Sequence, residues 1–332
     1  MTSGLFRDRS NEYAIAYNQR NGNPWHGEGQ AFDGLMTVEE ALKASHCDFV
    51  VHKVPMETTV IDLEGTYRLD VADQYVTVRN NAATESGYEA FGPVGKVYEP
   101  FQPDELFEFA AEVAAHAPGQ ACIDVGGALF GGRMVFCHVD LGAVTVDPDG
   151  INDTILTGLA AMTRFDAKMS TVLYLANIRP VCNNTVTAGL RATQRKITIR
   201  HTAGQVARVE EAQRALGFII ARRDTVVEAA ERLLRVECSL SDVERVVAGV
   251  FPKPEPGESD SRKRNWDERF QMIAANFDVE VETVGSNGWA VTNAIGEFLD
   301  HQQKGDVHAR NLKAMTGQTD ELKAKAEALV LA

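Results

Sequence analysis

The feature that most constrains the fold is a pair of stretches in which apolar residues recur at alternate positions. Residues 122–129 and 133–141 flank Phe130-Gly131-Gly132, a short connection rich in glycine. Alternation with a period of two indicates a β-strand, and a glycine-containing link of this length indicates a tight hairpin. The sequence therefore predicts two adjacent antiparallel strands here.

Further strands are predicted on both sides of this hairpin. A second hairpin pairs residues 154–162 with residues 170–178 across Arg164-Phe165-Asp166-Ala167. Shorter alternating stretches predict strands at 48–54, 75–79, 93–98 and 197–201.

Two helices are predicted before the first hairpin. Thr37 and Glu40 form a capping box for a helix that ends near Ser45. Pro103-Asp104-Glu105 opens a second, amphipathic helix that ends before Pro118-Gly119 and turns five residues inward. These five are Leu106, Phe107, Phe109, Ala110 and Val113. The predicted fold class is α+β: an antiparallel β-meander with a packed helix, followed by a helical C-terminal region.

Composition suggests where the domains divide. The first residues are polar, and prolines alternate with other residues from Pro252 to Pro256, which favours an extended linker. The predicted divisions are a flexible N-terminal arm (1–24), an α+β core (25–202), a helical extension (203–250), a linker (251–264) and a helical C-terminal subdomain (265–332).

Cysteine usage and hydropathy indicate the compartment. No apolar run approaches the roughly 20 residues needed to cross a bilayer, and no secretory signal is visible. The five cysteines are widely spaced, with no C-x-x-C pair, and the histidines show no zinc-site spacing. We expect a cytoplasmic protein of a bacterial host with reduced, mostly buried thiols, no membrane association, no metal and no cofactor.

Charge is distributed unevenly along the chain. The net charge is −14 over 332 residues, yet the segment from Arg179 to Arg223 holds nine basic and two acidic residues, a net charge of +7. This leaves −21 for the rest of the chain. Such asymmetry is typical of a polyanion site on an acidic body, although chance alternation of charge on solvated surfaces is the alternative explanation.

The basic segment predicts a nucleic-acid interface. The candidate contacts are Arg179, Arg191, Arg195, Lys196, Arg200, His201 and Arg208. Because this segment has no aromatic residue near its centre, base stacking would come from elsewhere. The stacking candidates are Trp25, Tyr98, Phe165 and Tyr174. Residues 184–193 are predicted to be helical, and Asn183, Asn184 and Thr185 are candidate caps and anion ligands at the start of that helix.

Two sequence patterns suggest other chemistry. Gly126-Gly127-Ala128-Leu129-Phe130-Gly131-Gly132 superficially resembles a phosphate-binding loop, but it lacks the Lys-Ser/Thr pair and is flanked by strands, which favours a hairpin. Cys182 is a candidate nucleophile with Asn183 and His201 as partners, against the simpler interpretation of a buried structural cysteine.

Seven motifs occur in the order seen in a known family. They are Pro24-Trp25-His26-Gly27, Tyr75-Val76-Thr77-Val78-Arg79, Val94-Gly95 with Tyr98, Gly126-Gly127 to Gly131-Gly132, Val181-Cys182-Asn183-Asn184-Thr185, Ile199-Arg200-His201-Thr202, and Trp289 with Asn293-Ala294 and Asp300-His301. With them the chain resembles the phage/plasmid-like proteins that carry a widespread prokaryotic domain of unknown function. The resemblance implies a bacteriophage, prophage or plasmid origin. The chain departs at Arg164-Phe165-Asp166-Ala167, where relatives tend to show His-Asp-Gly.

The order of elements and the mobile-element setting are also similar to single-strand annealing recombinases. The leading hypothesis is a non-enzymatic, homo-oligomeric protein that binds single-stranded nucleic acid, DNA rather than RNA, with a role in annealing or recombination. The alternatives are a protein-interaction or anti-defence factor that meets a host protein through the acidic surface, and an enzyme that uses Cys182 and His201.

Overall fold

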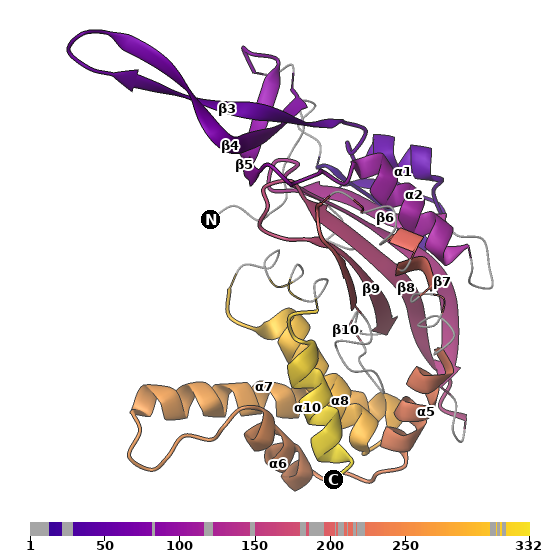
Figure 1. The fold of residues 1–332 in the computed structure, drawn as a ribbon. Coiled ribbons are helices and arrows are strands. Elements are labelled where there is room, and N and C mark those ends of the chain that lie inside the picture. Colours follow the sequence, from indigo (N-terminus) through magenta and orange to yellow (C-terminus); the bar gives the residue numbers. More distant parts are fainter. Residues whose placement is uncertain are drawn as a thin grey trace. The chain divides into compact units, whose positions relative to one another are not determined.

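A large sheet is the centre of the fold in the computed structural model (Figure 1). The model describes residues 13–21, 29–81, 84–115, 122–146, 150–179, 184–185, 196–202, 204, 209–210, 212–214, 217, 223–305, 310, 313 and 317–332, with the backbone alone at 21, 178–179, 184–185 and 223–224. The strands are β1 (Ile15–Asn18), β2 (Gln30–Phe32), β6 (Cys122–Leu129), β7 (Met134–Val146), β8 (Asp153–Arg164), β9 (Thr171–Arg179), β10 (Asn184–Thr185) and β11 (Lys196–Ile199). Their order is β10-β9-β8-β7-β6-β1-β2, and β11 also pairs with β9.

The hairpin read from the sequence forms as predicted. Strands β6 and β7 pair antiparallel up to Leu129 and Met134. Three consecutive turn residues, Phe130, Gly131 and Gly132, have positive φ angles, which glycine adopts with least strain. A Cβ at Gly132 would also meet the Arg79 guanidinium at 2.5 Å. These glycines therefore form a turn between strands, and no helix follows them as a phosphate-binding loop would require.

The N-terminal segment contains a strand that the sequence did not reveal. Residues 15–18 form β1, which pairs antiparallel with β6 and parallel with β2. Ile15 and Ala16 are fully buried. The prediction of a flexible arm through residue 24 is therefore wrong for this strand. A strand buried on both sides has no polar alternation by which to recognise it.

Two helices have the predicted ends and buried faces. In α1 (Val38–Ala44), the Thr37 side chain accepts from Glu40 N and the Glu40 carboxylate accepts from Thr37 N. Helix α2 (Pro103–Ala114) buries all five residues predicted to turn inward. The sheet meets α2 at Gly126, where an added Cβ would lie 2.9 Å from the Phe107 ring.

A three-stranded sheet extends well beyond the strands predicted for it. It consists of β3 (Val51–Ile61), β4 (Thr66–Asn80) and β5 (Tyr88–Gly95) in that order. Near its base all three strands pair, whereas the ends of β3 and β4 continue as a two-stranded hairpin that projects from the sheet (Figure 1). The sequence had indicated only the paired base.

The chain divides into two compact units, each formed from separate stretches. One contains residues 1–140, 159–174 and 197–217, and the other contains 141–158, 175–196 and 218–332. The second holds α5 (Arg223–Leu234), α6 (Leu240–Val250), α7 (Asp260–Val284), α8 (Gly288–Glu297), a π-helical turn at Phe298–Gln302 and α10 (Asp320–Val330).

These units differ from the divisions predicted by composition. Residues 251–264 lie inside the second unit, and α7 already begins at Asp260. The Trp266 indole donates to Phe251 O at 2.9 Å, which ties the start of α7 back to the end of α6. The proline-rich stretch is thus a connection within a unit.

The fold class is as predicted, an antiparallel-rich mixed sheet followed by a helical C-terminal region. Cys47, Cys137 and Cys238 are free and buried, and Cys122 is free and partly buried. Cys182 lies outside the described residues. Among the described helices, none combines the length and the apolarity required to cross a membrane.

Candidate nucleic-acid interface

Strand β11 presents two cations of the basic segment. Lys196, Thr198 and Arg200 are exposed, whereas the alternating Ile199 is buried. Successive side chains of a strand point to opposite faces, so this pattern places Lys196 and Arg200 on one side. Their spacing along the strand is about 13 Å. The prediction that these two residues share a side is confirmed.

His201 holds the end of this strand against the core. Its ring stacks on Tyr98, with ring centroids 4.8 Å apart and an interplanar angle of 25°. Its Nε2 lies 3.4 Å from Thr163 Oγ1 and 3.5 Å from Thr171 Oγ1. The backbone adds a second link, because Glu99 N donates to His201 O.

Burial decides the charge state of His201. Desolvation lowers the pKa of this imidazole, and hydrogen bonds with the backbone of Glu99 and Met169 only partly oppose it. A neutral, buried ring makes no ionic contact with a phosphate. His201 is therefore corrected from a nucleic-acid contact to a positioning residue, which fixes Arg200 on the adjacent exposed position.

The predicted stacking residues are core residues. Tyr98, Phe165 and Tyr174 are all buried. The Tyr98 hydroxyl donates to Arg164 O at 2.8 Å, and the Phe165 ring lies against Phe49 and Phe91. A buried ring offers no face to a base, so these three assignments are corrected. Trp25 lies outside the described residues.

The other predicted residues are only partly described. Arg191, Arg195, Arg208 and Asn183 lie outside the described residues, and Arg179 is described by its backbone alone. Asn184 and Thr185 form strand β10, paired with Arg179 and Ile178 of β9. The prediction that these two residues cap a helix is wrong, because their backbone bonds to a neighbouring strand.

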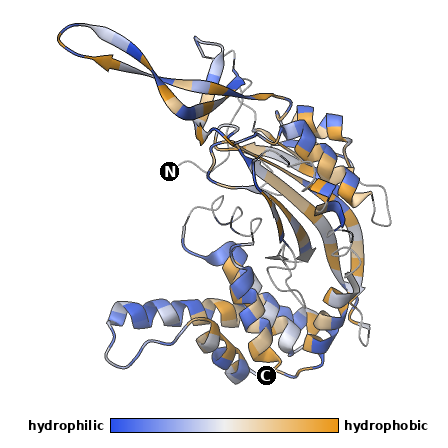
Figure 2. Cartoon of the chain, in the orientation of Figure 1, coloured by the Kyte–Doolittle hydropathy of each residue, from blue (hydrophilic) through white to orange (hydrophobic). Residues whose placement is uncertain are grey.

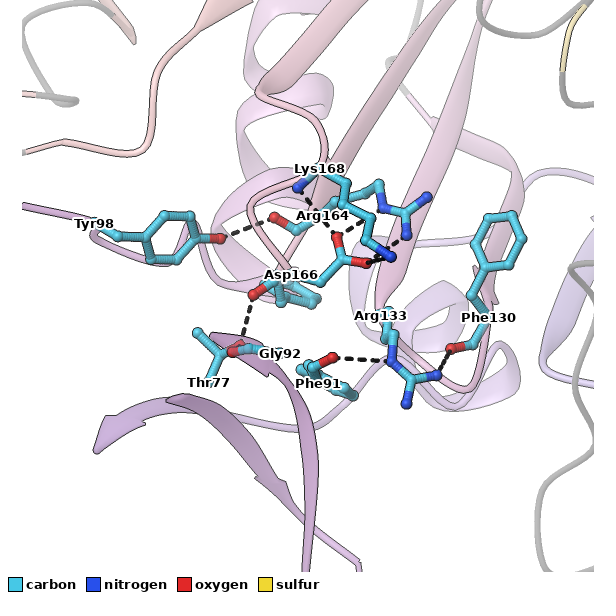
Figure 3. Close-up of polar contacts among 10 residues, drawn as sticks. Thr77, Phe91, Gly92, Tyr98, Phe130, Arg133, Arg164, Asp166 and Lys168 are labelled. Carbon is cyan, nitrogen blue, oxygen red and sulfur yellow. Dashed lines mark hydrogen bonds and ion pairs between the residues drawn. The ribbon is translucent and has the colours of Figure 1, made fainter. Parts of the chain in front are cut away.

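The turn between β8 and β9 contains an ion pair that sequence reasoning did not identify. Arg164 donates from Nε to Asp166 Oδ1 at 2.9 Å and from a terminal nitrogen to Oδ2 at 2.5 Å (Figure 3). The Asp166 side chain is 3% exposed. Burial alone would raise the pKa of Asp166, but the Arg164 guanidinium outweighs it and lowers that pKa. Lys168 N also donates to this carboxylate.

This turn fastens the three-stranded sheet to the main sheet. Thr77 Oγ1, on β4, donates to Phe165 O at 2.6 Å (Figure 3). Arg133 Nε, at the start of β7, donates to Phe91 O on β5 at 3.0 Å, and Phe165 N donates to Arg133 O. The available signal was the departure from the family pattern at Arg164-Phe165-Asp166-Ala167, which marks the residues that make these contacts.

A second buried polar pair lies between β6 and β7. His138 Nδ1 and Asp124 Oδ1 are 2.5 Å apart. Within the described part of the chain, the buried Nε2 of His138 has no hydrogen-bond partner. Burial would lower the pKa of His138, but Asp124, with a contribution from Asp140, outweighs it and raises the pKa. The pair is therefore an imidazolium and a carboxylate over a wider pH range than a free histidine allows.

We expect Asp124→Asn to destabilise the protein more at pH 6 than at pH 9. A raised native pKa contributes stability fully below the unfolded value of about 6.5, and the contribution is lost as pH rises through the native pKa. Urea unfolding at both pH values should show a difference in lost free energy of about 1 kcal/mol or more. Glu108→Gln, which removes one exposed carboxylate from α2, is the control. Equal losses at both pH values would contradict the assignment.

The described residues also limit metal chemistry. No group of three His, Cys, Asp or Glu side chains suited to a metal ion occurs among them. The arrangement described here can therefore present cations to an anion and hold them in place, with a neutral histidine as the anchor.

Comparison with known proteins identifies the family. Residues 90–330 match the family model described as a domain of unknown function, DUF932. No curated protein and no solved structure matches the chain. The match extends from β5 to the last helix and so includes both predicted hairpins and the basic segment. Because it covers well over half of the sequence, the chain belongs to the DUF932 family.

Proposed function

We propose that this protein binds single-stranded nucleic acid without catalysing a reaction on it. The observation that carries the proposal is the net charge of +7 between Arg179 and Arg223, with Lys196 and Arg200 exposed at alternate positions of β11. Cations on a strand are held at fixed spacing, and each one that meets a phosphate releases a bound counterion. Binding through such contacts requires no base-specific group.

The finer parts of the proposal are a DNA ligand, a homo-oligomer and a role in annealing during recombination or plasmid entry. They rest on the resemblance to phage and plasmid proteins and to annealing recombinases. The acidic remainder of the chain, at −21, supports a localised site because it repels phosphate elsewhere. A strand bound only at this segment would leave its bases available for pairing.

We expect the double variant Lys196→Gln with Arg200→Gln to weaken binding to a labelled single-stranded oligonucleotide at least tenfold at low salt. Each lost phosphate contact should reduce the slope of log affinity against log salt by about 0.7. Fluorescence anisotropy over a salt series measures both quantities.

The matched control is Arg232→Gln with Lys325→Gln, which removes the same charge from exposed positions on α5 and α10. It should leave the affinity within about twofold, since these residues lie outside the basic segment. Absence of any binding by the unaltered protein at low salt would refute the proposed function. An equal loss in both variants would indicate an effect of net charge alone.

A protein-interaction role is the second candidate, and the projecting β3–β4 hairpin favours it. Large apolar side chains on this hairpin are exposed. A pull-down from nuclease-treated host lysate separates the two candidates. A stoichiometric protein partner retained without nucleic acid would support this second function.

A further inference from the structure

The projecting hairpin has one apolar face and one charged face. We define the arm as residues 57–70, where β3 and β4 pair beyond a bulge in β3. Val60 lies opposite Tyr67, and Thr58 lies opposite Leu69. Because side chains alternate along each strand, these four share one face of the arm. Glu57, Asp70 and Arg68 lie on the other.

The apolar face is uncovered. Val60, Tyr67 and Leu69 are 42%, 44% and 51% exposed, and Leu63 at the tip is fully exposed. Figure 2 shows hydrophobic positions interrupting the polar ones along this hairpin. A two-stranded hairpin is marginally stable in water by itself, and contiguous exposed apolar residues are typical of an interaction surface. The arm therefore has the composition of a segment that packs against something else.

The tip is ordered by its own hydrogen bonds. Asp62 Oδ1 accepts from Glu64 N at 2.8 Å and from Gly65 N at 3.0 Å, while Asp62 N donates to Gly65 O. This Asp-based turn closes the hairpin and leaves the Leu63 side chain outside it. At the other end, Thr77 and Phe91 fasten the sheet to the β8–β9 turn and to Arg133. The arm is thus anchored at its base and closed at its tip.

The charge of the arm restricts its partner. Four carboxylates and one guanidinium give the arm a net charge of −3. Glu57 and Asp70 lie directly opposite each other, and no described ion pair includes either of them. Like charges at opposed positions are unfavourable in an isolated hairpin, and a cation between them relieves the repulsion. A nucleic acid or an acidic surface would increase it.

We propose that the arm docks onto the basic segment, residues 179–223, of a second copy of this chain. That segment carries +7 in a chain whose remainder carries −21, so it complements the arm in charge. Its exposed members include Lys196, Arg200 and Arg214. The apolar face of the arm would supply the buried area, and the carboxylates would select the basic segment.

This contact joins two different surfaces, so it is heterologous. Repeated from copy to copy, it builds a ring or a filament, and exchanged between two copies it closes a dimer. Nucleic acid would compete with the arm for the same cations. The inference is independent of the proposed function, because assembly through the arm requires no nucleic acid.

The first test measures the mass of the full chain by sedimentation velocity over a range of concentrations, without nucleic acid. We expect the unaltered protein to associate and Leu63→Asp with Leu69→Asp to sediment as a monomer. The matched control, Val279→Asp, alters a residue that is 66% exposed on α7 and should associate normally. Circular dichroism establishes that each variant is folded. An unaltered protein that stays monomeric, or a double variant that still associates, overturns the proposal.

The second test identifies the docking surface. A photoreactive amino acid replaces Leu63, and the labelled chain is mixed with isotopically heavy, unlabelled chain before irradiation. Mass spectrometry should find cross-links from position 63 to heavy peptides of residues 179–223. Cross-links confined to the same copy, or to heavy peptides elsewhere, refute the proposed contact. Loss of nucleic-acid binding in a separate assay would leave this result unchanged.

Discussion

Replacing Arg164 with methionine should destabilise the first compact unit by about 3 kcal/mol. Arg164 makes two hydrogen bonds to Asp166, whose side chain is 3% exposed. Without the guanidinium, the carboxylate keeps Lys168 N as a donor but loses its close cation. Breaking a buried pair by removing one partner leaves an uncompensated charge, which costs more than the pair contributes. Urea unfolding near pH 7 measures the loss.

The pH dependence of this loss follows from Asp166. Its pKa is lowered in the native state, so the stabilising contribution is present above the ordinary value of about 3.9 and disappears as pH falls through the native value. The difference between Arg164→Met and the unaltered protein should therefore shrink in acid. A loss that is unchanged near pH 3 would show that packing, and not the ion pair, is responsible.

Lys168→Met is the matched control for this experiment. It removes one positive charge near the same carboxylate, but Lys168 Nζ is 3.9 Å from Asp166 Oδ2 and its side chain is 74% exposed. Exposed pairs contribute between about 0 and 1 kcal/mol. Hydrogen exchange should also report faster opening at Thr77 in Arg164→Met, because Thr77 donates to the turn that Arg164 holds. The control should leave that exchange rate near its starting value.

The sequence predicted the elements whose signals are local. The capping box at Thr37 and Glu40, the buried face of α2 and the turn at Phe130-Gly131-Gly132 each depend on residues a few positions apart. Such patterns reflect backbone geometry, so they survive whatever the rest of the chain does. The two hairpins and the fold class followed from them.

The missed features depend on residues far apart in the chain. His201 is buried because Tyr98 stacks on it and because Thr163 and Thr171 lie beside it, and no local pattern reveals this. Asn184 and Thr185 are typical helix caps, yet pairing with β9 places them in a strand. The stacking residues were chosen for chemistry alone, whereas burial decides whether a ring is available. The charge excess was readable from the sequence, and the side on which Lys196 and Arg200 emerge was predicted correctly.

The polar interior of the second unit shows the same limit of sequence reasoning. The Trp289 indole donates to Asp153 Oδ2 at 2.7 Å across 136 residues, and both side chains are buried. Asp300 lies in a π-helical turn, a geometry that places its carboxylate against Lys323 of α10. A charged residue in an apolar helix could not be assigned to the interior until its partner was known. The ion pair of Asp300 and Lys323 therefore gives the second large prediction.

Lys323→Met should destabilise the second unit by about 3 to 5 kcal/mol. Lys323 Nζ lies 2.6 Å from Asp300 Oδ2, with side-chain exposures of 5% and 0%, and Thr319 Oγ1 donates to Asp300 Oδ1. A methionine fills similar space but leaves the Asp300 carboxylate without this ammonium. Thermal or urea unfolding, followed by the fluorescence of Trp289, measures the change.

Two further variants separate charge from packing at this pair. Lys325→Met removes an exposed lysine from the same helix, and its effect should stay within about 0.5 kcal/mol. Adding Asp300→Asn to Lys323→Met removes the uncompensated charge, so the double variant should regain much of the lost stability. If the double variant is as unstable as the sum of the two single changes, the residues act independently. Recovery would instead show that the interior tolerates the pair only as a pair, which explains why both members lie buried at the contact between the π-helical turn and α10.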